Sequence, residues 1–225
     1  MHRPSRLEER AAARRCAGSL APPRAPVVAI IAVVVTAVVG ALVWSPQRPA
    51  GLDAWAARTL TVSKHSFPYR FASRLDDTMR VLPVLAGSLA IAVVAWLLLR
   101  RRDAVVASLV VAPVTAANEQ LLKLAGRRSL GVSIFTYPSG RAALATSLVL
   151  LLVLVLGAAG VRPVVRALVG ILGTVYVLAM AWARVATGQH LLTDVIGAMS
   201  LGVAVTLVTL LVLTARRQGD SETAY

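Results

Sequence analysis

The sequence is poor in cysteine and in aromatic residues. Cys16 is the single cysteine among 225 residues, which excludes a disulfide within the chain and a cysteine-based metal site. Phe, Trp and Tyr make up only 5% of the chain although 57% of it is hydrophobic, so the apolar excess consists of Ala, Val and Leu. A soluble domain is about 45–50% apolar. This composition therefore indicates a protein whose solvent is the lipid bilayer.

Acidic residues are also scarce. The chain has 10 Asp and Glu against 24 Lys and Arg, a net charge of +14. No soluble basic domain is present to bind nucleic acid, and basic residues beside apolar runs instead set membrane orientation and contact anionic lipid headgroups. No carboxylate cluster is available to bind a metal. We therefore expect the bilayer as a partner, and no nucleic acid, metal or cofactor.

Six uncharged apolar runs divide the chain. They are Val27–Trp44, Val81–Leu99, Ala104–Asn118, Ala142–Val161, Ala167–Ala183 and Val195–Ala215. A helix needs about 20 predominantly apolar residues to cross a bilayer. The third run reaches that length only if its helix continues past Glu119 through Leu122. The sequence predicts an all-α polytopic membrane protein with six transmembrane helices.

Basic residues at the ends of these runs predict the side of the membrane on which each loop lies. Lys and Arg favour the cytoplasmic side, and with six helices four basic regions share one side. These regions are the tail 1–24, the turn Arg100–Arg102, the turn with Arg162 and Arg166, and the tail 216–225. We expect cytoplasmic termini, a membrane domain over residues 25–215 and an extracytoplasmic loop over residues 45–80. Within that loop, GLDAWAARTL is expected to form a short amphipathic helix at the interface.

The most specific motif is RVATGQHLLTDVIGA, which places Arg184, His190 and Asp194 in the spacing R-x5-H-x3-D. His190 and Asp194 share a face if the helix has begun at His190. A carboxylate on one ring nitrogen fixes the tautomer and leaves the other nitrogen as nucleophile or base. The N-terminus of the last helix, expected at this spot, favours phosphate. In a simpler interpretation, Asp194 starts a helix and His190 is an interfacial histidine.

A second, weaker motif begins the fourth apolar run. In Pro138-Ser139-Gly140, the glycine lets the backbone approach a ligand, and backbone N–H groups and the Ser139 hydroxyl can bind phosphate oxygens. Serine is equally a good helix N-cap, so the motif alone is weak.

A third motif, NEQLLKLAGRR, places Lys123, Arg127 and Arg128 at the outer end of the third run. Arginine forks match phosphate geometry. The simpler interpretation is a lysine that extends to the interface and pairs with Glu119. In a six-helix topology all three motifs lie at the same membrane face, and together they supply the parts of a phosphoryl-transfer site.

The order of these motifs resembles that of the membrane-bound type 2 phosphatidic acid phosphatase family, whose motifs are approximately K-x6-R-P, P-S-G-H and S-R-x5-H-x3-D. The resemblance covers Lys123 to Asp194 and the six-helix layout. It implies that His190 attacks phosphorus and that Asp194 orients it. It also implies a set of phosphate-binding residues: Lys123, Arg127 or Arg128, Ser139, Gly140 and Arg184.

Three departures from the family pattern affect these roles. Ala183 replaces the serine before Arg184, and the first motif is compressed and lacks its proline, which leaves both Arg127 and Arg128 as candidates, with Arg128 preferred. Arg141 replaces the histidine that protonates the leaving oxygen. Arginine does not release its proton at neutral pH, and general acid catalysis is worth about 10²–10⁴-fold. This loss matters least for a diphosphate substrate, and Arg141 can still stabilise negative charge.

The sequence thus predicts a phosphatase that hydrolyses lipid phosphate or prenyl diphosphate at the extracytoplasmic face through a phosphohistidine intermediate, with His190, Asp194 and Arg141 as catalytic residues. The alternative is a catalytically impaired family member that binds phosphorylated lipid, which Arg141 and the altered first motif support. A transporter is a third interpretation, disfavoured because spans one, two and six lack polar residues at mid-membrane. The Ala-, Arg- and Val-rich composition favours a bacterial plasma membrane.

Overall fold

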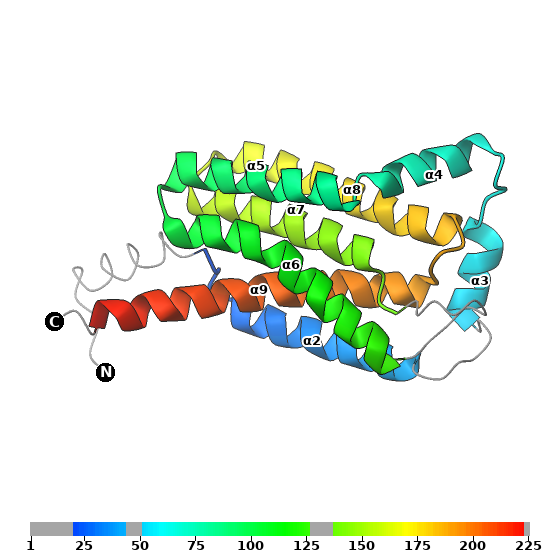
Figure 1. Ribbon diagram of the computed structural model, residues 1–225, viewed down its shortest axis with the longest axis horizontal. Coiled ribbons are helices and arrows are strands. Elements are labelled where there is room, and N and C mark those ends of the chain that lie inside the picture. Colours follow the sequence, from blue (N-terminus) through cyan, green and yellow to red (C-terminus); the bar gives the residue numbers. More distant parts are fainter. Residues whose placement is uncertain (1–19, 44–50, 127–136, 223–225) are drawn as a thin grey trace.

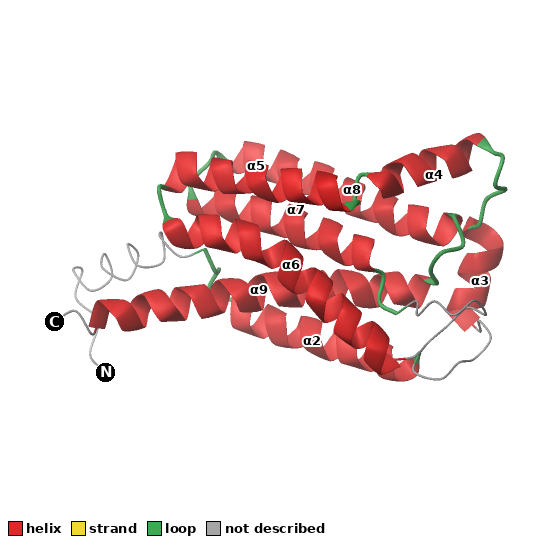
Figure 2. Cartoon of the chain, in the orientation of Figure 1, coloured by secondary structure: helices red, strands yellow, loops and turns green. Residues whose placement is uncertain are grey.

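The computed structural model describes residues 20–43, 51–126 and 137–222, and every regular element within these ranges is a helix (Figures 1 and 2). Within these ranges, six helices are long and apolar enough to cross a membrane: α2 (Ala25–Leu42), α5 (Val81–Leu99), α6 (Arg102–Gly126), α7 (Gly140–Ala158), α8 (Pro163–Ala186) and α9 (Leu192–Glu222). The prediction of an all-α protein with six transmembrane helices is confirmed. The third of them, α6, continues past Glu119 as its length requires.

The transmembrane helices pack through small side chains. Helix α9 contacts α2, α6 and α7, and the shorter helix α2 runs beside one part of α9 (Figure 1). Ala29 of α2 and Ala143 of α7 are buried, and a Cβ at Gly202 of α9 would clash with the Ala143 carbonyl oxygen. Large apolar side chains such as Ile30 and Leu82 lie on the outside. This distribution suits a bundle in lipid, where close backbone approach rather than burial of large side chains drives packing.

Tyr137 anchors the segment that leads into α7. Its hydroxyl donates a hydrogen bond of 2.6 Å to the carbonyl oxygen of Thr36 on α2. Its ring lies so close to Gly197 of α9 that a Cβ at that position would clash with it. The start of α7 is therefore tied to both α2 and α9.

The described residues of the three sequence motifs lie at one end of the bundle. The C-terminal ends of α6 and α8 and the N-terminal ends of α7 and α9 lie there, together with two short helices, α3 (Gly51–Leu60) and α4 (Phe67–Asp77) (Figure 1). The short helix expected in the loop is confirmed as α3. Helix α4 was not expected from the sequence.

Helix α4 packs against the last turns of α8. Ala72 of α4 is fully buried against Ala183 and Ala186, and the rings of Phe71 and Trp182 are 6.4 Å apart. The loop between the first two spans is thus folded onto the bundle end rather than simply solvated.

Candidate active site

A chain of contacts joins the second and third motifs. The backbone N–H of Ser139 donates to the carbonyl oxygen of Asp194 (3.2 Å), and the backbone N–H of His190 donates to the carbonyl oxygen of Arg184 (3.2 Å). His190 Nδ1 lies 3.7 Å from Asp194 Oδ2. The start of α7, the turn before α9 and the end of α8 therefore form one compact unit that brings these four residues together.

His190 lies in the turn between α8 and α9 rather than on a helix. Helix α9 begins at Leu192, so the condition under which His190 and Asp194 would share a helical face is not met. The turn brings the two side chains together instead, and Asp194 Oδ2 also accepts the Leu191 N–H (2.9 Å). At 3.7 Å the histidine and the carboxylate are close without a hydrogen bond, and His190 is buried. Burial lowers the pKa of His190 and so favours the neutral ring that a nucleophile requires.

The N-terminus of α9 does not present all of its N–H groups to a ligand. Asp53 of α3 accepts the backbone N–H and the hydroxyl of Thr193, at 2.9 and 2.8 Å. Together with the Asp194 contact to Leu191, two backbone donors at this end are bound to carboxylates. The expectation that this helix end would favour a phosphate is weakened, because its field is partly neutralised.

Ser139 begins α7 with an extended backbone, as an N-cap residue does, but its side chain makes no capping hydrogen bond. Its hydroxyl is fully buried and has no hydrogen-bond partner among the residues that the structure describes. Buried hydroxyls are normally paired. The N-cap interpretation therefore leaves the Ser139 hydroxyl unexplained, and an anion at this point would satisfy it.

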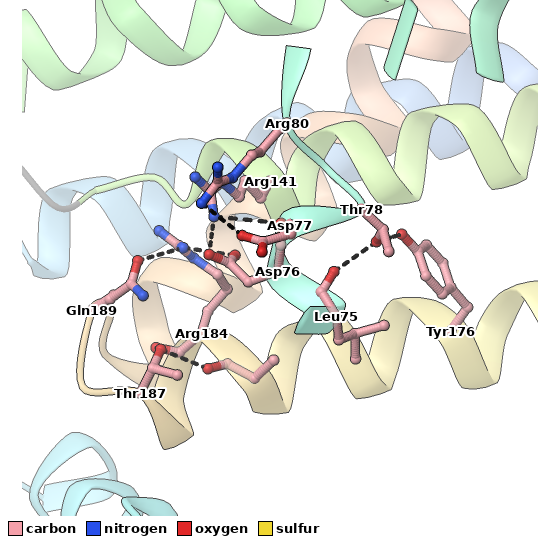
Figure 3. A network of polar contacts seen from close by, with 11 residues as sticks. Leu75, Asp76, Asp77, Thr78, Arg80, Arg141, Tyr176, Arg184, Thr187 and Gln189 are labelled. Carbon is pink, nitrogen blue, oxygen red and sulfur yellow. Dashed lines mark hydrogen bonds and ion pairs between the residues drawn. The ribbon is translucent and has the colours of Figure 1, made fainter. Parts of the chain in front are cut away.

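Arg184 lies in the last turn of α8 and is buried. Its Nη1 donates to Asp76 Oδ1 (2.7 Å) and to Gln189 Oε1 (2.6 Å), as Figure 3 shows. Its Nε is buried and, within the described ranges, has no hydrogen-bond partner. One edge of this guanidinium is therefore held by protein groups, while another edge has an unused donor.

Arg141 follows the Pro-Ser-Gly turn in the first turn of α7. Its Nη1 contacts Asp76 Oδ2 and lies 3.4 Å from the Asp76 carbonyl oxygen (Figure 3). One carboxylate on α4 thus binds the two arginines of the site. Asp76 could not be recognised from the sequence, because nothing in its local sequence distinguishes it from the solvated charges of the same loop. Gln189 lies within the RVATGQHLLTDVIGA motif, but the R-x5-H-x3-D spacing assigns it no role.

Lys123 forms an ion pair with Glu119 one turn earlier on α6, as the simpler interpretation of this motif expects. The Glu119 carboxylate is buried against Gly140, where a Cβ would clash with it. Gly140 therefore provides room for a side chain of α6 as well as access to the turn. Arg127 and Arg128 lie outside the described residues.

In the part of the chain that the structure describes, no group of three or more His, Cys, Asp or Glu side chains could hold a metal ion.

The protein-family comparison matches the part of the chain that carries the three sequence motifs. The PAP2 superfamily model covers residues 112–218, which include every site position from Lys123 to Asp194. The chain is a membrane member of the PAP2 superfamily. The expected resemblance to the type 2 phosphatidic acid phosphatases is confirmed at the level of this superfamily. Asp76, on α4, lies outside the matched region.

This PAP2 superfamily protein is also similar in fold to a solved structure. It is similar to a crystal structure described as the first transmembrane PAP2 type phosphatidylglycerolphosphate phosphatase from Bacillus subtilis, with a TM-score of 0.68 and 16% sequence identity. The similarity covers 88% of this chain and 97% of the other. At this identity it shows a shared fold. No curated protein matches the sequence.

Proposed function

We propose that this PAP2 superfamily protein is an integral-membrane phosphatase that hydrolyses a lipid phosphate or a prenyl diphosphate at the extracytoplasmic face. The observation that carries the proposal is the pair of buried donors, Arg184 Nε and Ser139 Oγ, which lack partners in the described part of the chain. Leaving buried donors unpaired costs about 1–3 kcal/mol each. A phosphate oxygen bound beside His190 would satisfy both.

In this reaction His190 is the nucleophile. Its Nε2 lone pair forms a bond to the terminal phosphorus, and the bond between that phosphorus and the oxygen linking it to the rest of the lipid breaks. This oxygen leaves with the electron pair, as an alkoxide from a monoester or as the lipid monophosphate from a diphosphate. Asp194, already 3.7 Å from Nδ1, moves within hydrogen-bond distance and stabilises the positive ring. Water then attacks phosphorus, the P–N bond breaks, and inorganic phosphate leaves with regeneration of neutral His190.

The leaving group decides which substrate suits this site. Arg141 retains its proton, so a leaving alkoxide must take a proton from water. A leaving phosphate needs little protonation, and a nearby arginine can stabilise its charge. A diphosphate lipid is therefore the better substrate, with its apolar chain in the outer leaflet and its phosphates at the bundle end.

The alternative is a protein that binds phosphorylated lipid without turnover. One observation favours it: the position of the family's acid histidine holds Arg141, and this arginine is bound to Asp76. The arrangement of Arg184, His190 and Asp194 favours the enzyme, because a binding site alone needs no buried histidine next to a carboxylate.

Phosphate release by the purified full chain in detergent tests the proposal. A prenyl diphosphate and phosphatidic acid are offered in parallel to the native chain, to His190→Ala and to the control His65→Ala, which changes an exposed histidine between α3 and α4. We expect release by the native chain and by His65→Ala, and a loss of at least about 10³-fold in His190→Ala. Binding of both lipids without release by the native chain would establish the alternative.

A further inference from the structure

Helix α4 brings a carboxylate into contact with two arginines of the candidate active site. Asp76, one residue before the C-terminal end of α4, is 4% exposed although it belongs to a loop between spans. The end of α4 is held on α8, because the Thr78 hydroxyl lies 2.6 Å from the Tyr176 hydroxyl and also donates to the Leu75 carbonyl oxygen (2.6 Å; Figure 3). The position of Asp76 is therefore fixed by packing as well as by its charge.

The contacts of Asp76 determine which edge of Arg184 is free. A guanidinium Nη atom carries two N–H groups, and Arg184 Nη1 donates to both Asp76 and Gln189. Because the guanidinium is planar, two fixed bonds at one nitrogen fix the plane of the whole group. Nε and Nη2 then form the remaining edge, and the Nε on that edge is the buried donor without a partner among the described residues. An edge of this shape matches two oxygens of a phosphate.

The second oxygen of Asp76 connects this arrangement to the Pro-Ser-Gly turn. Asp76 Oδ2 contacts Arg141, which comes directly after that turn. The carboxylate therefore lies between two guanidiniums and offsets their mutual repulsion. It links α4 to α7 and α8, which supply Ser139 and Arg184.

We propose that Asp76 is a positioning residue that holds Arg184 with its Nε edge directed at the substrate phosphate, and that Arg141 serves this arrangement by holding the second carboxylate oxygen. This role rests on the proposed phosphatase function. Misplacement of a phosphate ligand by about 1 Å can cost about 10²-fold in rate. A positioning role therefore acts mainly on kcat, where transition-state contacts count, and less on KM.

The test compares two neighbouring carboxylates. Asp76→Asn keeps the shape of the side chain and removes its charge. Asp77→Asn is the matched control, because Asp77 is the next residue, is more exposed and pairs only with Arg80 (2.8 Å) among the described residues. Both variants and the native full chain are assayed in detergent for phosphate release and for binding of orthovanadate, which imitates the transferring phosphoryl group and needs no knowledge of the lipid.

We expect Asp76→Asn to lower kcat by about 10–100-fold with KM within about threefold, and to weaken orthovanadate binding by a similar factor to kcat. Asp77→Asn should match the native chain within about twofold. A native kcat in Asp76→Asn would overturn the proposal. Tighter orthovanadate binding by this variant would also overturn it, because it would show that Asp76 competes with the ligand anion for Arg184.

A second variant covers a folding failure of Asp76→Asn. Asp76→Glu keeps the charge and displaces the carboxylate by one methylene, so a lower kcat with an unchanged melting temperature supports positioning, whereas a native kcat contradicts it.

The native chain distinguishes failure of the proposed function from failure of the role proposed for Asp76. If the native chain binds orthovanadate but releases no phosphate, the proposed phosphatase function is contradicted. The orthovanadate affinities of the native chain and Asp76→Asn then decide the role of Asp76. A native chain that does neither overturns both proposals.

Discussion

Ser139 and Asp194 are joined by a backbone hydrogen bond of 3.2 Å, donated by the Ser139 N–H to the Asp194 carbonyl oxygen. The two residues are 55 positions apart and start different helices, α7 and α9. The bond fixes the Pro-Ser-Gly turn beside Asp194, whose carboxylate lies next to the His190 ring. Changes at either helix start are therefore expected to affect both the proposed phosphate-binding groups and the proposed nucleophile.

The pH dependence of activity should reflect the environment of His190. Burial lowers its pKa, the nearby Arg184 acts in the same direction, and Asp194 opposes both. In the proposed mechanism the nucleophile is the neutral ring of His190, so activity should be retained above the pKa of His190 and lost below it. We expect the acid limb of kcat/KM, which reports the free enzyme, to lie below pH 6.5.

The same profile in Asp194→Asn identifies the group responsible. Removal of the carboxylate removes the interaction that raises the pKa of His190, so the limb should move to still lower pH while kcat falls. A limb that stays at one pH in both proteins belongs to the substrate, and a limb above pH 6.5 contradicts a buried neutral histidine.

Arg141→His should change the balance between substrates. A histidine at this position can donate a proton to a leaving alkoxide, so we expect phosphate release from phosphatidic acid to rise relative to release from a prenyl diphosphate, by about tenfold or more. The ratio of the two kcat/KM values is the measurement. Arg141→Lys is the control, because lysine keeps the charge and is a poor acid at neutral pH; an equal shift of the ratio in both variants would contradict the proton-donor argument.

Gly140→Ala should disturb the site through Glu119. A Cβ at position 140 would clash with the Glu119 carboxylate, which is buried and paired with Lys123. We expect a lower melting temperature, corresponding to about 1–3 kcal/mol, and reduced phosphate release. Gly170→Ala in α8 is the matched control, because its Cβ would lie 4.0 Å from Val153 in ordinary contact. Equal melting temperatures for the two variants would show that Glu119 moves aside at little cost.

The predicted orientation can be tested with the single cysteine. Cys16 lies in the tail expected to be cytoplasmic, so a membrane-impermeant thiol reagent should leave it unlabelled in intact cells and label it after permeabilisation. In a Cys16→Ser background, Lys64→Cys introduces a thiol at an exposed position between α3 and α4, and this thiol should be labelled in intact cells. The reverse pattern would place the candidate site on the cytoplasmic side.

The sequence by itself determined the transmembrane helices and the principal candidate positions of the site. Length and apolarity of a run are local properties, and a helix in lipid satisfies its own backbone, so six runs predicted six helices without knowledge of their neighbours. The spacing of Arg184, His190 and Asp194 is likewise local. It brings the three residues together even though His190 lies in a turn and does not share a helical face with Asp194.

Only the tertiary structure decided how the charges of the site are paired. Asp76 binds Arg141 and Arg184, which are 65 and 108 residues away, and Asp53 binds Thr193 at a separation of 140 residues. These pairings depend on how α3 and α4 fold onto the bundle end, and a carboxylate in an exposed loop has the same local sequence as one that is buried. The charge of Arg141 is therefore balanced by a carboxylate on a distant helix, α4, which packs against α8.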